Sequence, residues 1–131
     1  AAAMASLAKA RKKLTAGISV VIFPEGTRGF HGRLGTFKRG AFLLAIKAKT
    51  PIVPVSISGS WRILGKKQWR LKSGEIEVFV HEPIAADRLG GKNSEELMQR
   101  VRAIIESRCR APDESKENPS GVSAVAALNV A

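Results

Sequence analysis

The sequence predicts an α/β fold with a mixed, mostly parallel sheet flanked by helices. Runs rich in β-branched and other apolar residues at 17–23, 51–58 and 75–81 are typical of strands. Beside them, apolar residues recur at helical spacing from residue 7, over 37–49 and after Asn93. These segments predict one small domain over residues 1–108. The Pro-, Ser- and acid-containing composition of residues 109–131 predicts a disordered tail.

The first helix and strand lead into the most informative segment of the chain. The apolar positions of this helix are Leu7, Ala10 and Leu14. Gly17 is expected to end the helix, because glycine is favoured just past a helix C-terminus. The run 17–23 then predicts a buried strand, and Pro24 ends it because proline cannot donate to a sheet ladder.

The later elements follow the same logic. Pro54 within 51–58 indicates an irregular or edge strand. In 75–81, Ile76, Val78 and Val80 alternate with other residues, as in a half-buried strand. Asn93 is expected to cap the last helix. The apolar stripe of the 37–49 helix comprises Ala41, Leu44, Ala45 and Ala48, and that of the last helix comprises Leu97, Val101, Ile104 and Ile105.

Composition restricts the classes of function. The 131 residues carry a formal net charge of +11, which indicates an anionic partner. One cysteine, Cys109, excludes an internal disulfide and fits a reducing compartment. No apolar run approaches the roughly 18 residues of a membrane-spanning helix.

Residues 22–28, Ile-Phe-Pro-Glu-Gly-Thr-Arg, have the features of a binding site. Glu25 is the only acidic residue among the first 74 positions, which hold 15 lysines and arginines. Gly26 permits a tight turn and a close approach of the backbone to a ligand. Arg28 offers a planar fork suited to a phosphate, and Lys38 offers a point charge. A strand that opens into such a Gly-rich, basic loop before a helix is where α/β sheets bind anions.

Three segments in order then resemble the glycerolipid acyltransferases, most of all the 1-acyl-glycerol-3-phosphate (lysophosphatidate) acyltransferase group. They are Phe-Pro-Glu-Gly-Thr-Arg at 23–28, Phe-Lys-Arg-Gly-Ala at 37–41 and Pro-Ile-Val-Pro-Val at 51–55. The resemblance runs from about residue 7 to about residue 108. It implies a glycerol-3-phosphate acyltransferase-like fold, with Glu25, Gly26, Thr27 and Arg28 binding the acceptor. Lys38 is a further candidate for the phosphate because of its charge, independently of the resemblance.

The same resemblance implies a reaction. A fatty acyl group passes from acyl-CoA or acyl-carrier protein to the sn-2 hydroxyl of lysophosphatidate, giving phosphatidate. In the family a His-x-x-x-x-Asp motif supplies the general base, and neither a metal nor a further cofactor is implied. The residues five places after His31 and His81 are Thr36 and Ala86, so neither histidine fits this motif. We therefore expect the carboxy-terminal portion of an acyltransferase domain, inactive by itself.

The basic loop over 59–74 predicts contact with an anionic membrane surface. Tryptophan beside lysine and arginine suits the bilayer interface. The predicted contact residues are Trp61, Arg62, Lys66, Lys67, Trp69 and Arg70, with Lys72 adjoining them. We expect association with the cytoplasmic face of a membrane.

Several alternatives remain at this level. Glu25 either contacts the acceptor or holds the turn through backbone N–H groups, and both roles can coexist. Lys38 is equally consistent with a solvated helix start, and the 59–74 loop with an ordinary surface. His81 is expected to end a strand facing solvent. The rival function is a non-catalytic basic domain that binds anionic lipid or nucleic acid, although no nucleic acid is expected because no recognised motif for it is present.

Overall fold

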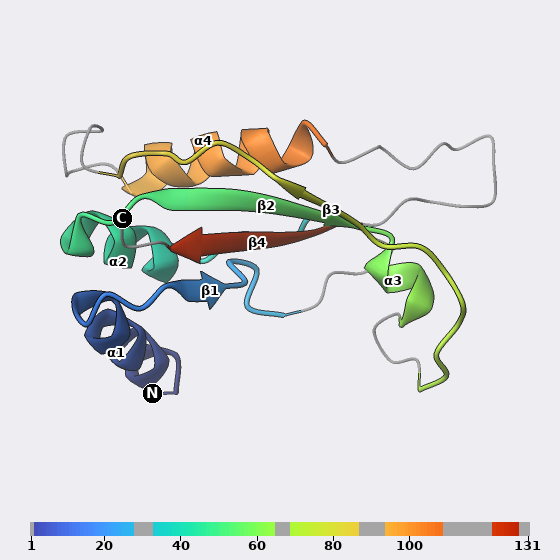
Figure 1. The fold of residues 1–131 in the computed structure, drawn as a ribbon, viewed down its shortest axis with the longest axis horizontal. Coiled ribbons are helices and arrows are strands. Elements are labelled where there is room, and N and C mark those ends of the chain that lie inside the picture. The colour runs from blue at the N-terminus through green and yellow to red at the C-terminus, as the bar shows by residue number, and fades with distance from the viewer. Residues whose placement is uncertain (1, 28–32, 65–68, 87–93, 109–121, 129–131) are drawn as a thin grey trace.

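The computed structural model describes residues 2–27, 33–64, 69–86, 94–108 and 122–128. Helices and strands mix along the chain, which confirms the α/β class. The elements are α1 (Ala2–Thr15), β1 (Val20–Ile22), α2 (Gly40–Ala48), β2 (Ile52–Ser58), α3 (Ser60–Ile63), β3 (Glu77–Val80), α4 (Ser94–Glu106) and β4 (Val122–Leu128). In Figure 1, α1 and α2 lie at one end of the sheet, α3 lies at the other, and α4 runs along the strands.

The sheet has the strand order β1-β4-β2-β3, and its described pairings are all antiparallel. The prediction of a mostly parallel sheet is therefore wrong for the described strands. The reason is the position of β4. Because β4 is antiparallel to both β1 and β2, those two strands run in the same direction but are separated by β4 (Figure 1).

The strand β4 belongs to the segment predicted as a disordered tail. The structure departs from that prediction at residues 122–128, whose backbone pairs with β1 on one side and with β2 on the other. The run Val-Ser-Ala-Val-Ala-Ala-Leu contains small residues that carry little strand signal by themselves. The remaining tail residues, 109–121 and 129–131, lie outside the described part of the chain.

The hydrophobic core lies between the sheet and the helices α2 and α4, and α1 packs against α2 and β1. Phe42, Ile52 and Leu97 are fully buried there. The rings of Phe37 and Phe42 stack with their centroids 6.2 Å apart. The predicted stripes of the second and last helices are confirmed, since their buried members are Ala41, Leu44, Ala45, Leu97, Val101 and Ile105. The expected cap Asn93 lies outside the described residues.

Pro54 lies in an interior strand, which corrects the expectation of an edge position. β2 has β4 on one side and β3 on the other. The carbonyl of Pro54 accepts a hydrogen bond from the His81 N–H at 2.9 Å, on the β3 side. The N and C=O groups of one strand residue point toward the same neighbouring strand. The N–H that Pro54 lacks would therefore point to the β3 side, just past the last residue of β3. The hydrogen bonds between β2 and β4 do not need it.

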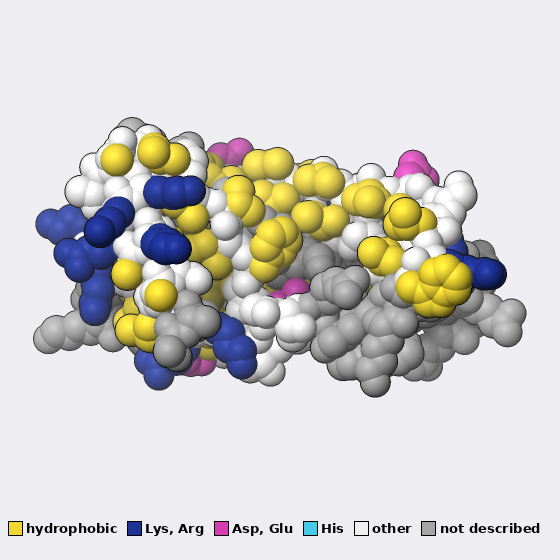
Figure 2. Space-filling view, turned by 90° about the horizontal axis from the view of Figure 1, so that it is seen from below, with side chains coloured by type: hydrophobic (Ala, Val, Ile, Leu, Met, Phe, Trp, Pro, Cys, Tyr) yellow, Lys and Arg dark blue, Asp and Glu magenta, His cyan; other side chains and the backbone are white. Residues whose placement is uncertain are grey.

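On the opposite face of the sheet, the apolar side chains of β3 are exposed. Val78 and Val80 of β3 are 57% and 63% exposed, and they pair with Ile57 and Val55 of β2. The predicted alternation of 75–81 is therefore present, but its apolar set faces away from the helices. Val21 is likewise 62% exposed, so β1 is half-buried and not buried as predicted. Figure 2 shows hydrophobic side chains extending across the surface seen from below, with Lys and Arg side chains gathered at the α1 end.

His81 joins the edge of the sheet to α4, and does not simply face solvent as expected. The Ser56 hydroxyl donates to the Ile105 carbonyl at 3.1 Å, and its oxygen lies 2.8 Å from His81 Nε2. Because the hydroxyl proton is directed at the carbonyl, His81 donates its Nε2–H to Ser56. The imidazole also packs edge-on to Phe79, and the Arg108 guanidinium lies 4.0 Å over that ring.

The stability of the fold is expected to depend on pH through His81. Burial, and then the nearby Arg108 charge, hold the pKa of the His81 imidazole below its ordinary value of 6.5. The unfolded chain therefore binds a proton at a higher pH than the folded chain. The lowered pKa of His81 therefore gives the folded state a contribution to stability that is present above pH 6.5. That contribution is lost as the pH falls toward the folded-state pKa.

Thermal unfolding between pH 7.5 and pH 5 checks this expectation. The melting temperature of the unmodified chain is expected to fall more steeply toward low pH than that of His81→Gln, which keeps a side-chain N–H donor but does not titrate. Parallel pH profiles for the two proteins would show that His81 does not contribute to the pH dependence.

Candidate functional site

The segment after β1 folds into a turn that depends on Gly26. The Gly26 N–H donates to the Phe23 carbonyl at 3.0 Å, and Gly26 has φ +70°. This left-handed conformation favours glycine because a Cβ would clash with the backbone. The Lys38 N–H donates to the Pro24 carbonyl at 2.7 Å, which places the start of the Phe-Lys-Arg-Gly-Ala segment against the turn. Two of the three segments singled out in the sequence are thus neighbours in space.

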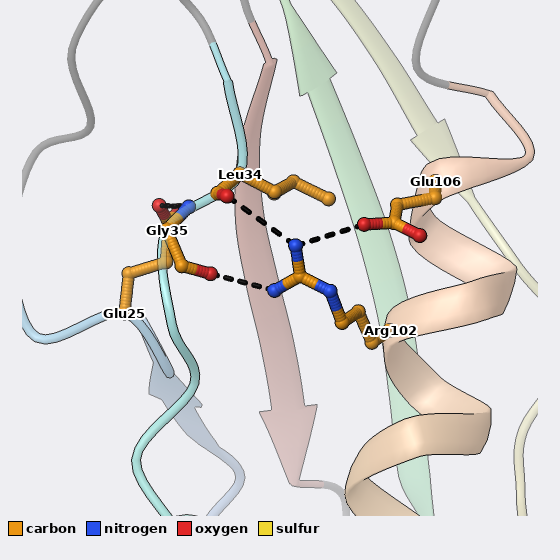
Figure 3. Close-up of polar contacts among 5 residues, drawn as sticks. All are labelled: Glu25, Leu34, Gly35, Arg102 and Glu106. Carbon is orange, nitrogen blue, oxygen red and sulfur yellow. Dashed lines mark hydrogen bonds and ion pairs between the residues drawn. The ribbon is translucent and has the colours of Figure 1, made fainter.

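Glu25 points into the protein from this turn. Only 6% of the residue is exposed, and its Oε2 accepts a hydrogen bond from the Gly35 N–H at 2.6 Å (Figure 3). A Cβ at Gly35 would lie 2.9 Å from the same oxygen, so a larger residue here would require the carboxylate to shift. Glu25 thus accepts a backbone N–H from the loop that follows, while the turn itself is closed by the bond from the Gly26 N–H to the Phe23 carbonyl. A direct contact of Glu25 with the acceptor stays a prediction.

The Gly35 loop is held in turn by Arg102 of α4. Arg102 donates to the Gly35 carbonyl at 2.6 Å and to the Leu34 carbonyl at 3.3 Å. It also pairs with Glu106, one helical turn along, at 2.9 Å (Figure 3). Its guanidinium carbon lies 5.2 Å from the centroid of the Phe37 ring. These contacts connect α4 to the loop that Glu25 binds.

Beside the turn lies a largely apolar hollow of about 480 Å³ between α1, β1 and the start of α2. Its walls include Leu7, Val21 and Phe23, and it reaches Gly26 of the motif. Lys38, which is exposed, is the one charged residue among the described residues that line the hollow. A hollow with apolar walls and a cation at one side suits an amphiphile that carries an anionic group.

The predicted acceptor-binding residues are placed only in part. Glu25, Gly26, Thr27 and Lys38 converge around the turn, with Gly26, Thr27 and Lys38 exposed and Glu25 buried. Arg28 lies outside the described residues, so its assignment to the phosphate stays a prediction.

Two residues of this arrangement were missed by the sequence reasoning. Gly35 stood in a Gly-rich loop without a distinct role. The sequence around Arg102 indicates only an ion pair with Glu106 four residues later, and nothing in it points to the Gly35 loop.

The described residues supply neither a nucleophile–base pair nor a metal site at the turn. His81 contacts Ser56, but the serine proton is directed at a backbone carbonyl, so this pair is structural. His31 lies outside the described residues. Within the described ranges, no group of three or more His, Cys, Asp or Glu side chains is placed to hold a metal ion.

The residues of the predicted membrane-contact loop differ in their exposure. Trp69 is 83% exposed, and the Arg70 guanidinium carbon lies 4.9 Å from the centroid of its ring. Trp61 and Arg62 are half-buried in α3, and the indole Nε1 of Trp61 is buried without a hydrogen-bond partner among the described residues. Lys66 and Lys67 lie outside the described part of the chain. The described helices include none long and apolar enough to cross a membrane.

Comparisons with known proteins agree with the motif. Residues 1–58 match the family described as Acyltransferase. The chain is 41% identical over 93 residues to 1-acyl-sn-glycerol-3-phosphate acyltransferase alpha of Homo sapiens, covering 71% of this chain and 33% of that protein. It is 45% identical over 69 residues to the chloroplastic enzyme BAT2 of Brassica napus, covering 52% of this chain and 20% of that protein. The chain thus spans a third or less of the length of these relatives.

A solved structure supports the same relationship. The crystal structure of the 1-acyl-sn-glycerophosphate acyltransferase PlsC from Thermotoga maritima superposes with a TM-score of 0.71 at 33% sequence identity. The alignment covers 77% of this chain and 41% of PlsC. The chain therefore belongs to the acyltransferase family, as a homologue of the 1-acyl-sn-glycerol-3-phosphate acyltransferases over part of its length.

Proposed function

We propose that this chain forms the acceptor-binding part of an enzyme that acylates lysophosphatidate to phosphatidate. The observation that carries the proposal is the turn after β1. There Glu25 is fixed by Gly35, and Lys38 stands beside an apolar hollow that reaches the motif. A lysophospholipid has the matching chemistry, with a phosphate for the cations and an acyl chain for apolar walls.

In the proposed reaction the sn-2 hydroxyl of the acceptor attacks the thioester carbonyl of acyl-CoA or acyl-carrier protein. A C–O bond forms, the C–S bond breaks, and the carrier thiol leaves. The hydroxyl proton must pass to a general base. These 131 residues contain no His-x-x-x-x-Asp motif, so in this proposal the base comes from polypeptide other than this chain.

Within this scheme Arg28 binds the acceptor phosphate. Support comes from its place in the chain, directly after the turn formed by Glu25, Gly26 and Thr27. A planar guanidinium donates two parallel hydrogen bonds to a phosphate, which an ammonium cannot do. Lys38 adds a second cation across the turn.

A membrane role is proposed for the surface around Trp69. The large exposed ring and the adjacent Arg70 and Lys72 combine an amphipathic aromatic group with cations. Such a surface suits the headgroup region of an anionic bilayer. Since lysophosphatidate is itself a membrane lipid, this contact would bring the chain to its acceptor on the cytoplasmic face.

The isolated chain is expected to lack acyltransferase activity. Thiol release from acyl-CoA in the presence of lysophosphatidate should not exceed the rate without protein, because the general base is missing. Turnover by the chain alone, abolished by His31→Ala or His81→Ala, would contradict this expectation and identify a replacement base.

Arg28→Ala is expected to weaken binding of glycerol 3-phosphate by about 10- to 100-fold, the usual effect of losing a hydrogen bond to a charged group. NMR titration of the chain with glycerol 3-phosphate, and with glycerol as the uncharged ligand, measures the loss. Arg28→Lys should restore part of the affinity, because the charge remains but the fork is lost.

The exposed Arg33 of the same loop offers a matched control. Arg33→Ala should leave the affinity nearly unchanged. An equal loss of affinity in Arg28→Ala and Arg33→Ala would mean that Arg28 acts only through its positive charge. An unchanged affinity in Arg28→Ala would contradict the proposed contact between Arg28 and the phosphate.

Vesicle binding tests the proposed membrane surface. Sedimentation with phosphatidylcholine vesicles containing phosphatidylserine should decrease with salt, since each cation near the surface contributes about 1 kcal/mol. Trp69→Ala should weaken binding more than Trp61→Ala, because only Trp69 is largely exposed. Equal binding to purely neutral vesicles at high salt, or equal effects of the two substitutions, would contradict this assignment.

A further inference from the structure

A single peptide group connects Arg102 with the buried carboxylate of Glu25. The Leu34 carbonyl and the Gly35 N–H belong to the same peptide unit. Its oxygen accepts from Arg102 Nη2 at 3.3 Å, and its N–H donates to Glu25 Oε2 at 2.6 Å (Figure 3). A cation therefore lies at the carbonyl end of this peptide dipole and an anion at its N–H end.

The next peptide unit strengthens the connection. Arg102 Nη1 donates to the Gly35 carbonyl at 2.6 Å, so the guanidinium holds two successive carbonyls. Glu106 accepts from the same guanidinium at 2.9 Å and fixes its orientation from one helical turn away. Arg102 is also the better sheltered partner of that pair, with 28% of its side chain exposed against 47% for Glu106.

We propose that Arg102 is a positioning residue for the acceptor-binding motif, acting on Glu25 through the Leu34–Gly35 peptide group. Hydrogen bonds in a chain polarise one another, so donation to the Leu34 carbonyl makes the Gly35 N–H a better donor to Glu25. Glu25 is the direct neighbour of Gly26 in the motif, so the proposed influence of Arg102 reaches the motif through this carboxylate. The part of this inference that concerns the acceptor rests on the proposed function.

An ordinary surface ion pair does not account for this geometry. An i,i+4 Arg–Glu pair on an exposed helix needs only the two side chains and contributes little to stability. Here the guanidinium instead reaches across to a loop 67 positions away in the sequence. Its removal would leave two carbonyls without their donor and the Phe37 ring without its cation.

Hydrogen exchange of the Gly35 amide tests the positioning role directly. Arg102→Gln should accelerate exchange of this amide by about tenfold or more, as expected when a charged hydrogen-bond partner is lost. Amides in the middle of α4 should keep their protection. The matched control is Arg100→Gln, which removes an exposed arginine from the same helix and should leave Gly35 unchanged.

Arg102→Lys separates charge from geometry. An ammonium keeps the positive charge but is not a planar fork, so Gly35 exchange should lie between the rates of the unmodified chain and of Arg102→Gln. If Arg102→Gln unfolds the chain, the exchange rate of the Gly35 amide in Arg102→Lys is the test of the proposal. Faster Gly35 exchange with protected α4 amides supports the proposal. Exchange of Gly35 at the unmodified rate in a folded Arg102 variant overturns it.

Binding of glycerol 3-phosphate forms the second arm. Arg102→Gln should weaken this binding several-fold, with part of the affinity restored in Arg102→Lys and none lost in Arg100→Gln. An unchanged affinity in Arg102→Gln would overturn the link between Arg102 and the acceptor. If the unmodified chain does not bind glycerol 3-phosphate, the proposed function fails, while Gly35 exchange still decides the positioning role.

Discussion

The site depends on one interaction, the hydrogen bond from the Gly35 N–H to the buried carboxylate of Glu25. A carboxylate removed from water is costly unless hydrogen bonds satisfy it. That requirement draws the Gly35 loop against the turn after β1, and a Cβ at Gly35 would require the Glu25 carboxylate to shift. The same loop leads along the chain to Lys38 and then to α2. The position of the loop therefore affects both the geometry of the motif and the start of α2.

A second constraint is the one-sided coverage of the sheet. α2 and α4 bury the face that carries Ile52 and Ser56, while Val78 and Val80 on the other face are exposed among the described residues. Buried apolar area stabilises a fold in proportion to its extent, so the stability of this chain comes mainly from the covered face. Ser56 and His81 tie α4 to that face by hydrogen bonds and add a pH-dependent contribution to it.

Charge and shape agree around the acceptor motif. Lys38 lies at an apolar hollow, α1 contributes further cations at the same end of the molecule, and the net charge is +11 (Figure 2). A positive field of this kind concentrates anions before any specific contact forms. Discrimination among anions then requires fixed donors, which is why the hydrogen bonds that Glu25 and Arg102 make with the loop matter for the proposed function.

Most of the secondary structure and the acceptor motif could be predicted from the sequence, because glycine, proline and apolar periodicity act on near neighbours in the chain. Gly26 and the apolar stripe of α4 are examples. Which side of β3 is covered could not be predicted, since Val78 and Val80 alternate equally well for either face. Only the tertiary structure placed β4 between β1 and β2, because pairing of distant strands is decided by the whole sheet and not by local sequence. For the same reason only the fold brought Arg102 to Gly35, across 67 positions.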